Sequence, residues 1–244
     1  VRVDVGQVRF TSNDGREEER YFLNVADFGL GGEVVREVTE RRMQRKASSY
    51  VRCLLTTMAR YRNKRVRIRV DGETLPDGEY LIGAVANGKI FGKGMKVAPD
   101  ARLDDGLFDA VLVRGFRFLE FCRHGWKLMN GSHVTHPKVS VVKGRRIEAW
   151  AEEGEEVLLE LDGDQLGRLP ATFEIVPANL LIKGVPPTDA DLTLGSERQD
   201  RGLAARGAAS AEHPKRSFPS GGYFFMASAG SLTRTVRPSA SLTM

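Results

Sequence analysis

"KRVRIRVDGETLPDGEYLIGAVANG", residues 64–88, contains two strand patterns separated by residues typical of turns. Val66, Ile68 and Val70 alternate with arginines, which predicts a half-buried strand with a basic outer face. The following "EYLIGAVANG" is apolar on both faces and predicts a strand buried more completely. This stretch therefore favours a fold built mainly from strands.

Further strand and helix patterns lie on both sides of this stretch. Strand patterns occur at residues 1–10, 20–32, 107–115, 136–144, 145–152, 156–164, 171–177 and 179–184. Residues 33–61 read as two helices around the basic break 41–49, and residues 116–130 read as one amphipathic helix. Many short strands with two helical interruptions predict an α+β domain that is mostly β, an antiparallel β-sandwich with two or three helices.

The helix predicted at 116–130 carries Leu119, Cys122, Trp126 and Met129 at helical spacing, as an apolar face. Cys53 also lies among apolar residues at helical spacing. Both cysteines are therefore expected to be buried free thiols, without a disulfide.

Charge and hydropathy narrow the class of protein. The 244 residues carry a net charge of +5, which favours anionic partners. The basic stretch 41–69 lacks the interleaved aromatic residues of RNA-binding sheets, so no nucleic acid is expected, although this stretch could lean on anionic lipid. No apolar run reaches the ~20 residues of a membrane span, and no secretory signal opens the chain. These features predict a cytoplasmic protein.

Periodicity ends near residue 184. Residues 1–184 form the predicted domain, whereas residues 185–244 are rich in Ala, Ser, Gly, Arg and Pro and are expected to be a disordered tail. Because the chain opens with Val1 directly in a strand pattern, we expect it to be a piece of a longer protein.

"NGKIFGKGMKVAPDARLDDGLFD", residues 87–109, could hold a ligand or form plain turns. Gly88, Gly92 and Gly94 allow the backbone close to a phosphate, with lysines between them. The spacing matches neither a P-loop nor GxGxxG, and a glycine-rich hairpin is the simpler alternative. Asp104, Asp105 and Asp109 sit at a turn at Gly106 whose carboxylate and freed carbonyl oxygens suit Mg²⁺, with a plain Asp-Gly turn as the alternative.

A third candidate is "LELDGDQLGRLP", residues 159–170, where Asp162 and Asp164 end an apolar strand. A carboxylate held at the end of a buried strand can act as a general base. A DG hairpin turn is again the alternative that spacing alone favours.

Four segments follow one another along the chain: "RYFLNVADFGLGGEVV", "VANGKIFGKGMKVAPDARLDDGLFD", "NGSHVTHPKV" and "LDGDQLGRLPATFEIVPANL". Together and in this order they resemble the C-terminal domain of bacterial diacylglycerol kinase-like lipid kinases, relatives of diacylglycerol and sphingosine kinases. The resemblance implies the C-terminal domain of the lipid kinase / NAD kinase-like two-domain fold, with ATP in the cleft between the domains. The GGDGT nucleotide loop of the family's N-terminal domain is not in this sequence.

The resemblance also implies roles for particular residues. The glycine segment, with Asn87, Gly88, Gly92 and Gly94, would line the cleft. A structural Mg²⁺ would be held by the carboxylate of Asp105 and the main-chain carbonyls of Arg102 and Leu107.

Asp164 takes the position of the family's catalytic base. The family has Glu there, and Asp is shorter by about 1.5 Å. A misplacement of ~1 Å can cost on the order of 10²-fold in rate, so the departure bears on activity.

The implied reaction transfers the γ-phosphoryl group of ATP to the hydroxyl of a diacylglycerol-type lipid, at the inner surface of a membrane that the protein visits transiently. Without the nucleotide loop, the chain alone is expected not to turn over ATP. The alternative is a non-catalytic lipid-binding or regulatory module on the same fold. An NAD kinase-like phosphotransferase fits the "PDARLDDGL" segment less well. The oligomeric state stays open, with a homodimer among the alternatives.

Overall fold

The computed structural model describes residues 1–40, 47–92 and 94–182. The predicted break between two helices at 41–49 falls largely outside the described residues, and so do the predicted domain end at 184 and the tail from 185. The described residues Val1–Ile182 form one compact unit.

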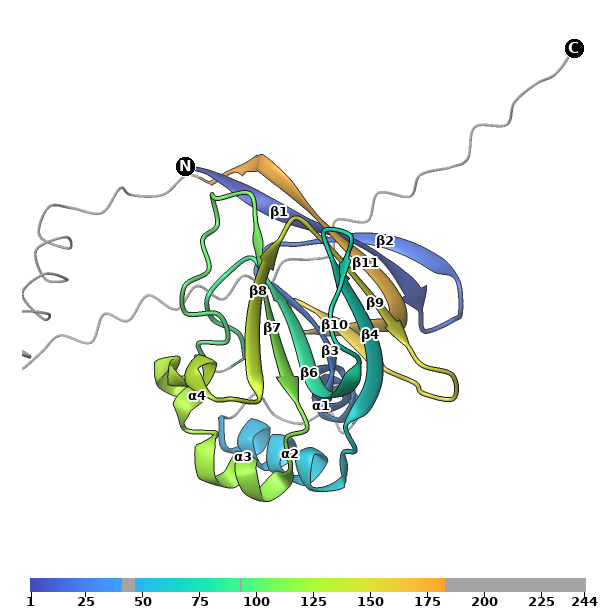
Figure 1. The fold of residues 1–244 in the computed structure, drawn as a ribbon, viewed down its shortest axis with the longest axis vertical. Coiled ribbons are helices and arrows are strands. Elements are labelled where there is room, and N and C mark those ends of the chain that lie inside the picture. The colour runs from blue at the N-terminus through green and yellow to red at the C-terminus, as the bar shows by residue number, and fades with distance from the viewer. Residues whose placement is uncertain (41–46, 93, 183–244) are drawn as a thin grey trace, which may run out of the picture. The chain divides into compact units, whose positions relative to one another are not determined.

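Eleven strands and five helical segments make up the described part of the chain (Figure 1). The strands are β1 (Arg2–Ser12), β2 (Glu17–Phe22), β3 (Val25–Gly29), β4 (Lys64–Val70), β5 (Glu73–Thr74), β6 (Gly78–Ala86), β7 (Phe108–Arg114), β8 (Val139–Gly144), β9 (Arg146–Ala151), β10 (Leu158–Leu161) and β11 (Asp164–Leu181). The helices are α1 (Leu30–Glu40), α2 (Ala47–Arg60), α3 (Phe118–His124), α4 (Lys127–Asn130) and the 3₁₀ helix η1 (Ser132–Thr135).

The strands pair in the order β5-β4-β9-β11-β10-β3-β6-β7-β8, with every pairing antiparallel. β4 also pairs with the first residues of β6, so six strands close on themselves. Outside this ring β1 pairs with β11, and β2 pairs with β1. The enclosed core is apolar and includes Phe28, Phe108 and Phe173, each at most 1% exposed. Burying such a side chain contributes ~1.5–3 kcal/mol. The predicted mostly-β α+β sandwich is confirmed.

The sequence predicts one continuous strand over residues 20–32, and this prediction is wrong. The chain bends at Leu23 and Asn24, which separates β2 from β3. The N–H groups of both bend residues donate to the carboxylate of Asp162. Because these donors serve a side chain, they are not available to a strand ladder. In contrast, the pattern at 171–177 and the start of the pattern at 179–184 lie in one long strand, β11, which ends at Leu181; residues 183 and 184 fall outside the described residues.

The predicted helix 116–130 is two short helices, α3 and α4, separated at Gly125. This split explains why the described residues hold four α-helices instead of two or three. The predicted inward face is also wrong: Leu119, Trp126 and Met129 are exposed, and so is Cys122, whereas Cys53 is buried as expected. Helical period shows which residues share a face, but not which face meets the core.

The inward side of α3 consists of Phe118 and Phe121, which pack against a small apolar cluster shared with α1 and α2. In Figure 1 the helices α2, α3 and α4 gather at one end of the strands. None of the helices within the described ranges is long and apolar enough to cross a membrane.

Candidate functional site

The hairpin tip between β10 and β11 carries Asp162 and Asp164. Asp162 and Gly163 have φ angles of 48° and 99°, so the turn is tight and left-handed. The carboxylate of Asp162 accepts hydrogen bonds from the main-chain N–H groups of residues 23–25, at 2.8, 3.0 and 3.0 Å. Asp164 follows the turn and is exposed. The predicted general base is therefore accessible, and its neighbour fixes the turn that carries it.

Asn24 joins this hairpin tip to the predicted glycine segment. Its carbonyl accepts the N–H groups of Asn87 and Gly88 at 2.9 and 2.8 Å, and its side-chain amide donates to the carbonyl of Ile90 at 2.7 Å. A Cβ on Gly88 would lie 2.1 Å from Oδ1 of Asn24, so a larger residue here would displace the Asn24 side chain. Two stretches far apart in sequence thus meet at one bend.

Asn87 is fully buried and ties three segments together. Its Nδ2 donates to the carbonyls of Asp4 and Leu23, at 3.0 and 2.8 Å. Its Oδ1 is buried without a hydrogen-bond partner in the described structure. The amide nitrogen is thus committed to the fold, and the contact of Asn87 with a ligand stays a prediction.

Gly92 and Gly94 lie on an exposed loop that folds back on itself, with Phe91 and Met95 paired across it. Both glycines have positive φ, 56° and 93°. The loop starts beside Asn24 and leads away from it. Its contact with a phosphate or a lipid head group stays a prediction.

The turn with Arg102, Asp105 and Leu107 is anchored by Asp4, a buried residue of β1. The carboxylate of Asp4 accepts the N–H of Gly106 and the N–H of Ala178, both at 2.7 Å. Because Nδ2 of Asn87 donates to the carbonyl of Asp4, the turn and the glycine segment share one support.

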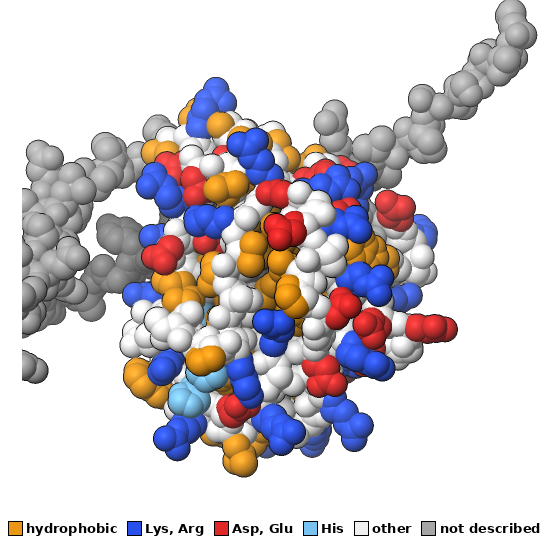
Figure 2. Space-filling view, in the orientation of Figure 1, with side chains coloured by type: hydrophobic (Ala, Val, Ile, Leu, Met, Phe, Trp, Pro, Cys, Tyr) orange, Lys and Arg blue, Asp and Glu red, His pale blue; other side chains and the backbone are white. Residues whose placement is uncertain are grey.

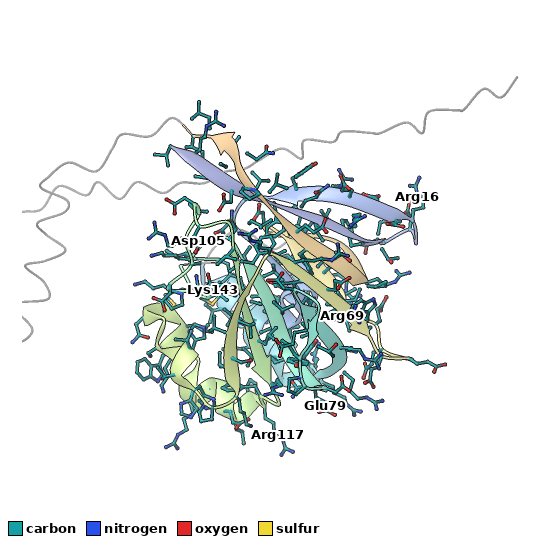
Figure 3. All side chains as sticks on the ribbon, turned by 45° about the horizontal axis from the view of Figure 1, so that its top comes forward. Arg16, Arg69, Glu79, Asp105, Arg117 and Lys143 are labelled. Carbon is teal, nitrogen blue, oxygen red and sulfur yellow. The ribbon has the colours of Figure 1, made fainter. Side chains whose placement is uncertain are left out.

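Lys143 lies beside this turn, with Nζ 3.3 Å from Oδ2 of Asp105 and 3.1 Å from Oδ2 of Asp109 (Figure 3). Oδ1 of Asp105 accepts the N–H of Leu107 at 3.2 Å. A carboxylate offers about four acceptor positions, so Asp105 keeps capacity for a cation beside Lys143. One carboxylate with main-chain carbonyls is the donor chemistry that Mg²⁺ takes, and the residues present fit such an ion. No cluster of three or more acidic, His or Cys side chains suited to a metal occurs among the described residues.

Asp4 and Asn24 were not among the residues predicted from sequence. The alternation of "VRVDV" predicts that Asp4 points away from the core, yet Val3, Asp4 and Val5 are all buried because β1 is covered on both faces. A charged residue inside a strand of valines was the available signal. The sequence held no such signal for Asn24, because the role of Asn24 depends on a residue 138 positions later in the chain.

Asp27 and Glu160 form a second, buried carboxyl pair behind the hairpin tip. They lie opposite each other on β3 and β10 and are 0% and 8% exposed. Burial raises the pKa of Asp27 well above its usual value, and the charge of Glu160 raises it further. Burial raises the pKa of Glu160 as well. Both carboxyl oxygens of Asp27 are buried without a hydrogen-bond partner in the described structure, and one proton shared with Glu160 would satisfy the pair.

This pair reaches the hairpin tip directly, because Oε1 of Glu160 accepts the N–H of Gly163 at 2.6 Å. Two carboxylates therefore hold the hairpin tip through hydrogen bonds: Asp162 binds it to the bend at residues 23–25, and Glu160 binds it to β10.

An apolar cavity lies at the opposite end of β3 and β6. Its volume is about 90 Å³, and its walls come from α1, α3, the glycine-segment loop and β7. Representative lining residues are Leu30, Leu81, Met95, Val113, Phe121 and Leu128. His133 closes one side, with Nε2 3.0 Å from the carbonyl of Val97, and burial lowers the pKa of this histidine. The glycine-segment loop thus extends from its hydrogen bonds with Asn24, beside the hairpin tip, to this cavity.

Comparison with known proteins gives a family match over most of the described chain. The model of the "YegS C-terminal NAD kinase beta sandwich-like domain" matches residues 24–183. A diacylglycerol kinase of Staphylococcus carnosus (strain TM300) is 29% identical over 175 residues, which cover 71% of this chain and 53% of that relative. A diacylglycerol kinase of Bacillus subtilis (strain 168) is 28% identical over 173 residues, covering 70% and 53%. The chain thus spans about half the length of these relatives.

A crystal structure from Bacillus anthracis str. Sterne, assigned as a diacylglycerol kinase, is similar with a TM-score of 0.52 and 24% identity. The likeness covers 73% of this chain and 54% of that one. At this identity the likeness shows the fold.

Proposed function

The chain belongs to the family of the YegS C-terminal NAD kinase beta sandwich-like domain, and from that membership we propose that it is the lipid-binding, base-carrying part of an ATP-dependent lipid kinase. The acceptor would be the hydroxyl of a diacylglycerol-type lipid. The relatives named diacylglycerol kinase, which match this chain over about half of their length, motivate the substrate class.

The observation that carries the proposal is the exposed carboxylate of Asp164 on a turn that is fixed from two sides. Phosphoryl transfer asks for positioning, charge neutralisation and a group to take the hydroxyl proton. In the proposed reaction the carboxylate of Asp164 accepts the proton of the lipid hydroxyl as that oxygen bonds to the γ-phosphorus, while the bond from that phosphorus to the β,γ-bridging oxygen breaks and ADP leaves. ATP supplies the phosphoryl group, bound with a further domain that carries the nucleotide loop.

Asp162 and Glu160 serve as positioning residues in this proposal. Asp162 accepts three main-chain N–H groups of the bend at residues 23–25, and Glu160 accepts the N–H of Gly163. A displacement of ~1 Å at a reacting group can lower a rate on the order of 10²-fold. The short side chain of Asp164 therefore makes the position of this turn more important than it would be for a longer Glu.

The apolar cavity supports a lipid as the acceptor. Its lining is almost entirely apolar, and Met95 and Val97 connect it to the segment that begins at Asn87. A volume of about 90 Å³ holds roughly three groups of the size of a water molecule. We propose that the cavity receives the end of one acyl chain and widens when α3 and α4 move outward.

Mg²⁺ is proposed at the turn of Asp105, where it would bind that carboxylate and the carbonyls of Arg102 and Leu107. Such an ion supplies positive charge that braces the turn. We also propose that the enzyme is cytoplasmic and reaches its lipid at the inner membrane surface.

The test uses the protein together with its nucleotide-binding domain and measures ATP-dependent phosphorylation of a diacylglycerol. Asp164→Asn keeps the size of the side chain but removes the base, and turnover is expected to fall about 10²–10⁴-fold. Asp164→Glu restores the residue of the family pattern and is expected to match or exceed the natural chain. Asp77→Asn, an exposed aspartate outside the site, is the matched control.

Unchanged turnover in Asp164→Asn would remove this residue from the mechanism. Lipid binding without any ATP-dependent product, in the natural chain and in Asp164→Glu alike, would favour the non-catalytic lipid-binding module instead.

A further inference from the structure

Helices α3 and α4 expose an apolar stripe that the fold does not use. Leu119, Trp126 and Met129 are 79%, 61% and 55% exposed, and Cys122 lies between them in sequence and is also exposed. These four residues define the α3–α4 face. Their spacing of three to four residues puts them on one side of the helical segment. Figure 2 shows apolar side chains among basic ones at its lower left, where Figure 1 places these helices.

Basic side chains flank the α3–α4 face. Arg117 and Arg123 are exposed, Lys127 is half-buried, and none of the three has an ion pair within the described ranges. Arg117 lies at the rim of the molecule (Figure 3). Glu120, the acidic residue of α3, is neutralised by Lys138 and caps the N–H of Arg117. The surface around the stripe therefore carries unpaired positive charge.

The same two helices line the apolar cavity with their inner side. Phe121, His124 and Leu128 face the cavity, whereas Leu119, Trp126 and Met129 face outward. A single thin wall thus separates the exposed stripe from the cavity. A lipid that leaves a bilayer beneath this wall has a short apolar path inward.

We propose that the α3–α4 face docks on an anionic lipid bilayer, with Leu119, Trp126 and Met129 inserted at the headgroup level. Trp at a boundary between apolar and polar groups, flanked by Arg and Lys, is the composition of interfacial helices. Each cation near an anionic surface adds attraction that a neutral surface does not provide. This charge complementarity selects a membrane over a second copy of the same basic chain. The proposal rests on the proposed function for its lipid class, but docking needs no phosphoryl transfer.

The first experiment measures partition of the 244-residue chain into vesicles of phosphatidylcholine alone and with phosphatidylglycerol, in the absence of ATP. Binding is expected to be stronger with phosphatidylglycerol and to weaken with salt. Trp126→Ala is expected to weaken binding about tenfold. Arg123→Gln is expected to weaken binding about fivefold on anionic vesicles only. Tyr21→Ala changes an exposed aromatic residue on β2 and serves as the matched control.

A second measurement locates the inserted residue. The sequence has two tryptophans, Trp126 and Trp150, so Trp150→Phe leaves Trp126 as the single reporter. Brominated lipids are expected to quench its fluorescence on anionic vesicles. Binding by Trp150→Phe without quenching, or binding by Trp126→Ala equal to that of the natural chain, would overturn the proposal.

Sedimentation tests whether a second copy of the chain, instead of a membrane, covers the α3–α4 face. A dimer that Trp126→Ala converts to a monomer, with vesicle binding unchanged, would show that a second copy covers the face and would overturn membrane docking. Because these measurements use no ATP, docking can hold while the kinase reaction fails, and the reverse can also occur.

Discussion

The two ends of strand β3 are built by different physical means. At Val25 the chain is fixed by directional hydrogen bonds to Asp162 and, through Asn24, to Asn87 and Gly88. At the other end, β3 leads into α1, and Leu30 enters an apolar cluster. Five residues of strand separate the two ends by ~17 Å.

The difference indicates that the two ends of β3 have different roles. Hydrogen bonds at the polar end fix positions to within a fraction of an ångström, which a reacting group requires. Apolar contacts at the helical end are non-directional and tolerate rearrangement, which suits a flexible chain such as an acyl group. Four substitutions can break or sharpen this comparison.

Asp4→Ala is expected to have the largest effect on stability. It leaves the N–H groups of Gly106 and Ala178 without their buried acceptor, and the free energy of unfolding is expected to fall by about 3 kcal/mol. Urea unfolding measures this change. Asp100→Ala, at an exposed position of the same connection, is the control. A loss no larger than that of the control would show that the polar end is not held by Asp4.

Phe121→Ala tests the helical end. Phe121 is only partly buried beside the cavity, so a loss of about 1–2 kcal/mol is expected, roughly half the value for a core phenylalanine. Leu119→Ala, on the exposed side of the same helix, should cost little. If Phe121→Ala destabilises the chain more than Asp4→Ala does, the order of the two ends is reversed.

Asp27→Asn tests the buried carboxyl pair through pH. The pKa of Asp27 is raised in the folded state, whereas its unfolded value is about 3.9. Between these two values the folded state binds more protons than the unfolded state, so the free energy of unfolding falls as pH rises. Asn cannot ionise, and the variant is expected to lose less stability between about pH 5 and about pH 8 than the natural chain. Urea unfolding at both pH values measures it, and equal losses would contradict the shared proton.

Asp105→Asn is expected to have the smallest effect, visible only with Mg²⁺. At about 10 mM Mg²⁺ the melting temperature of the natural chain should rise by about 2–4 °C. The variant should show no rise, and Asp77→Asn should behave as the natural chain does. Equal rises in all three would place the ion elsewhere.

Several features followed from the sequence alone. Alternation in residues 64–70 and the apolar run after it predicted the strands β4 and β6, and the mostly-β sandwich is confirmed. The reason is that strand period is a local property, carried by neighbouring residues. The resemblance drawn from four segments is confirmed by the family match to residues 24–183. The roles predicted for Asp164, Asp105 and the glycine segment stay predictions, because they depend on bound partners.

Tertiary structure decided what local pattern could not. The period of residues 116–130 was correct, but packing by Phe118 and Phe121 turned Leu119, Trp126 and Met129 outward. The break after β2, the burial of Asp4 and the meeting of Asn87 with the turn of Asp162 all depend on hydrogen bonds between residues more than sixty positions apart. A sequence states which groups can form such bonds. Only the closed sheet brings donor and acceptor together, because their separation along the chain carries no information about their distance in space.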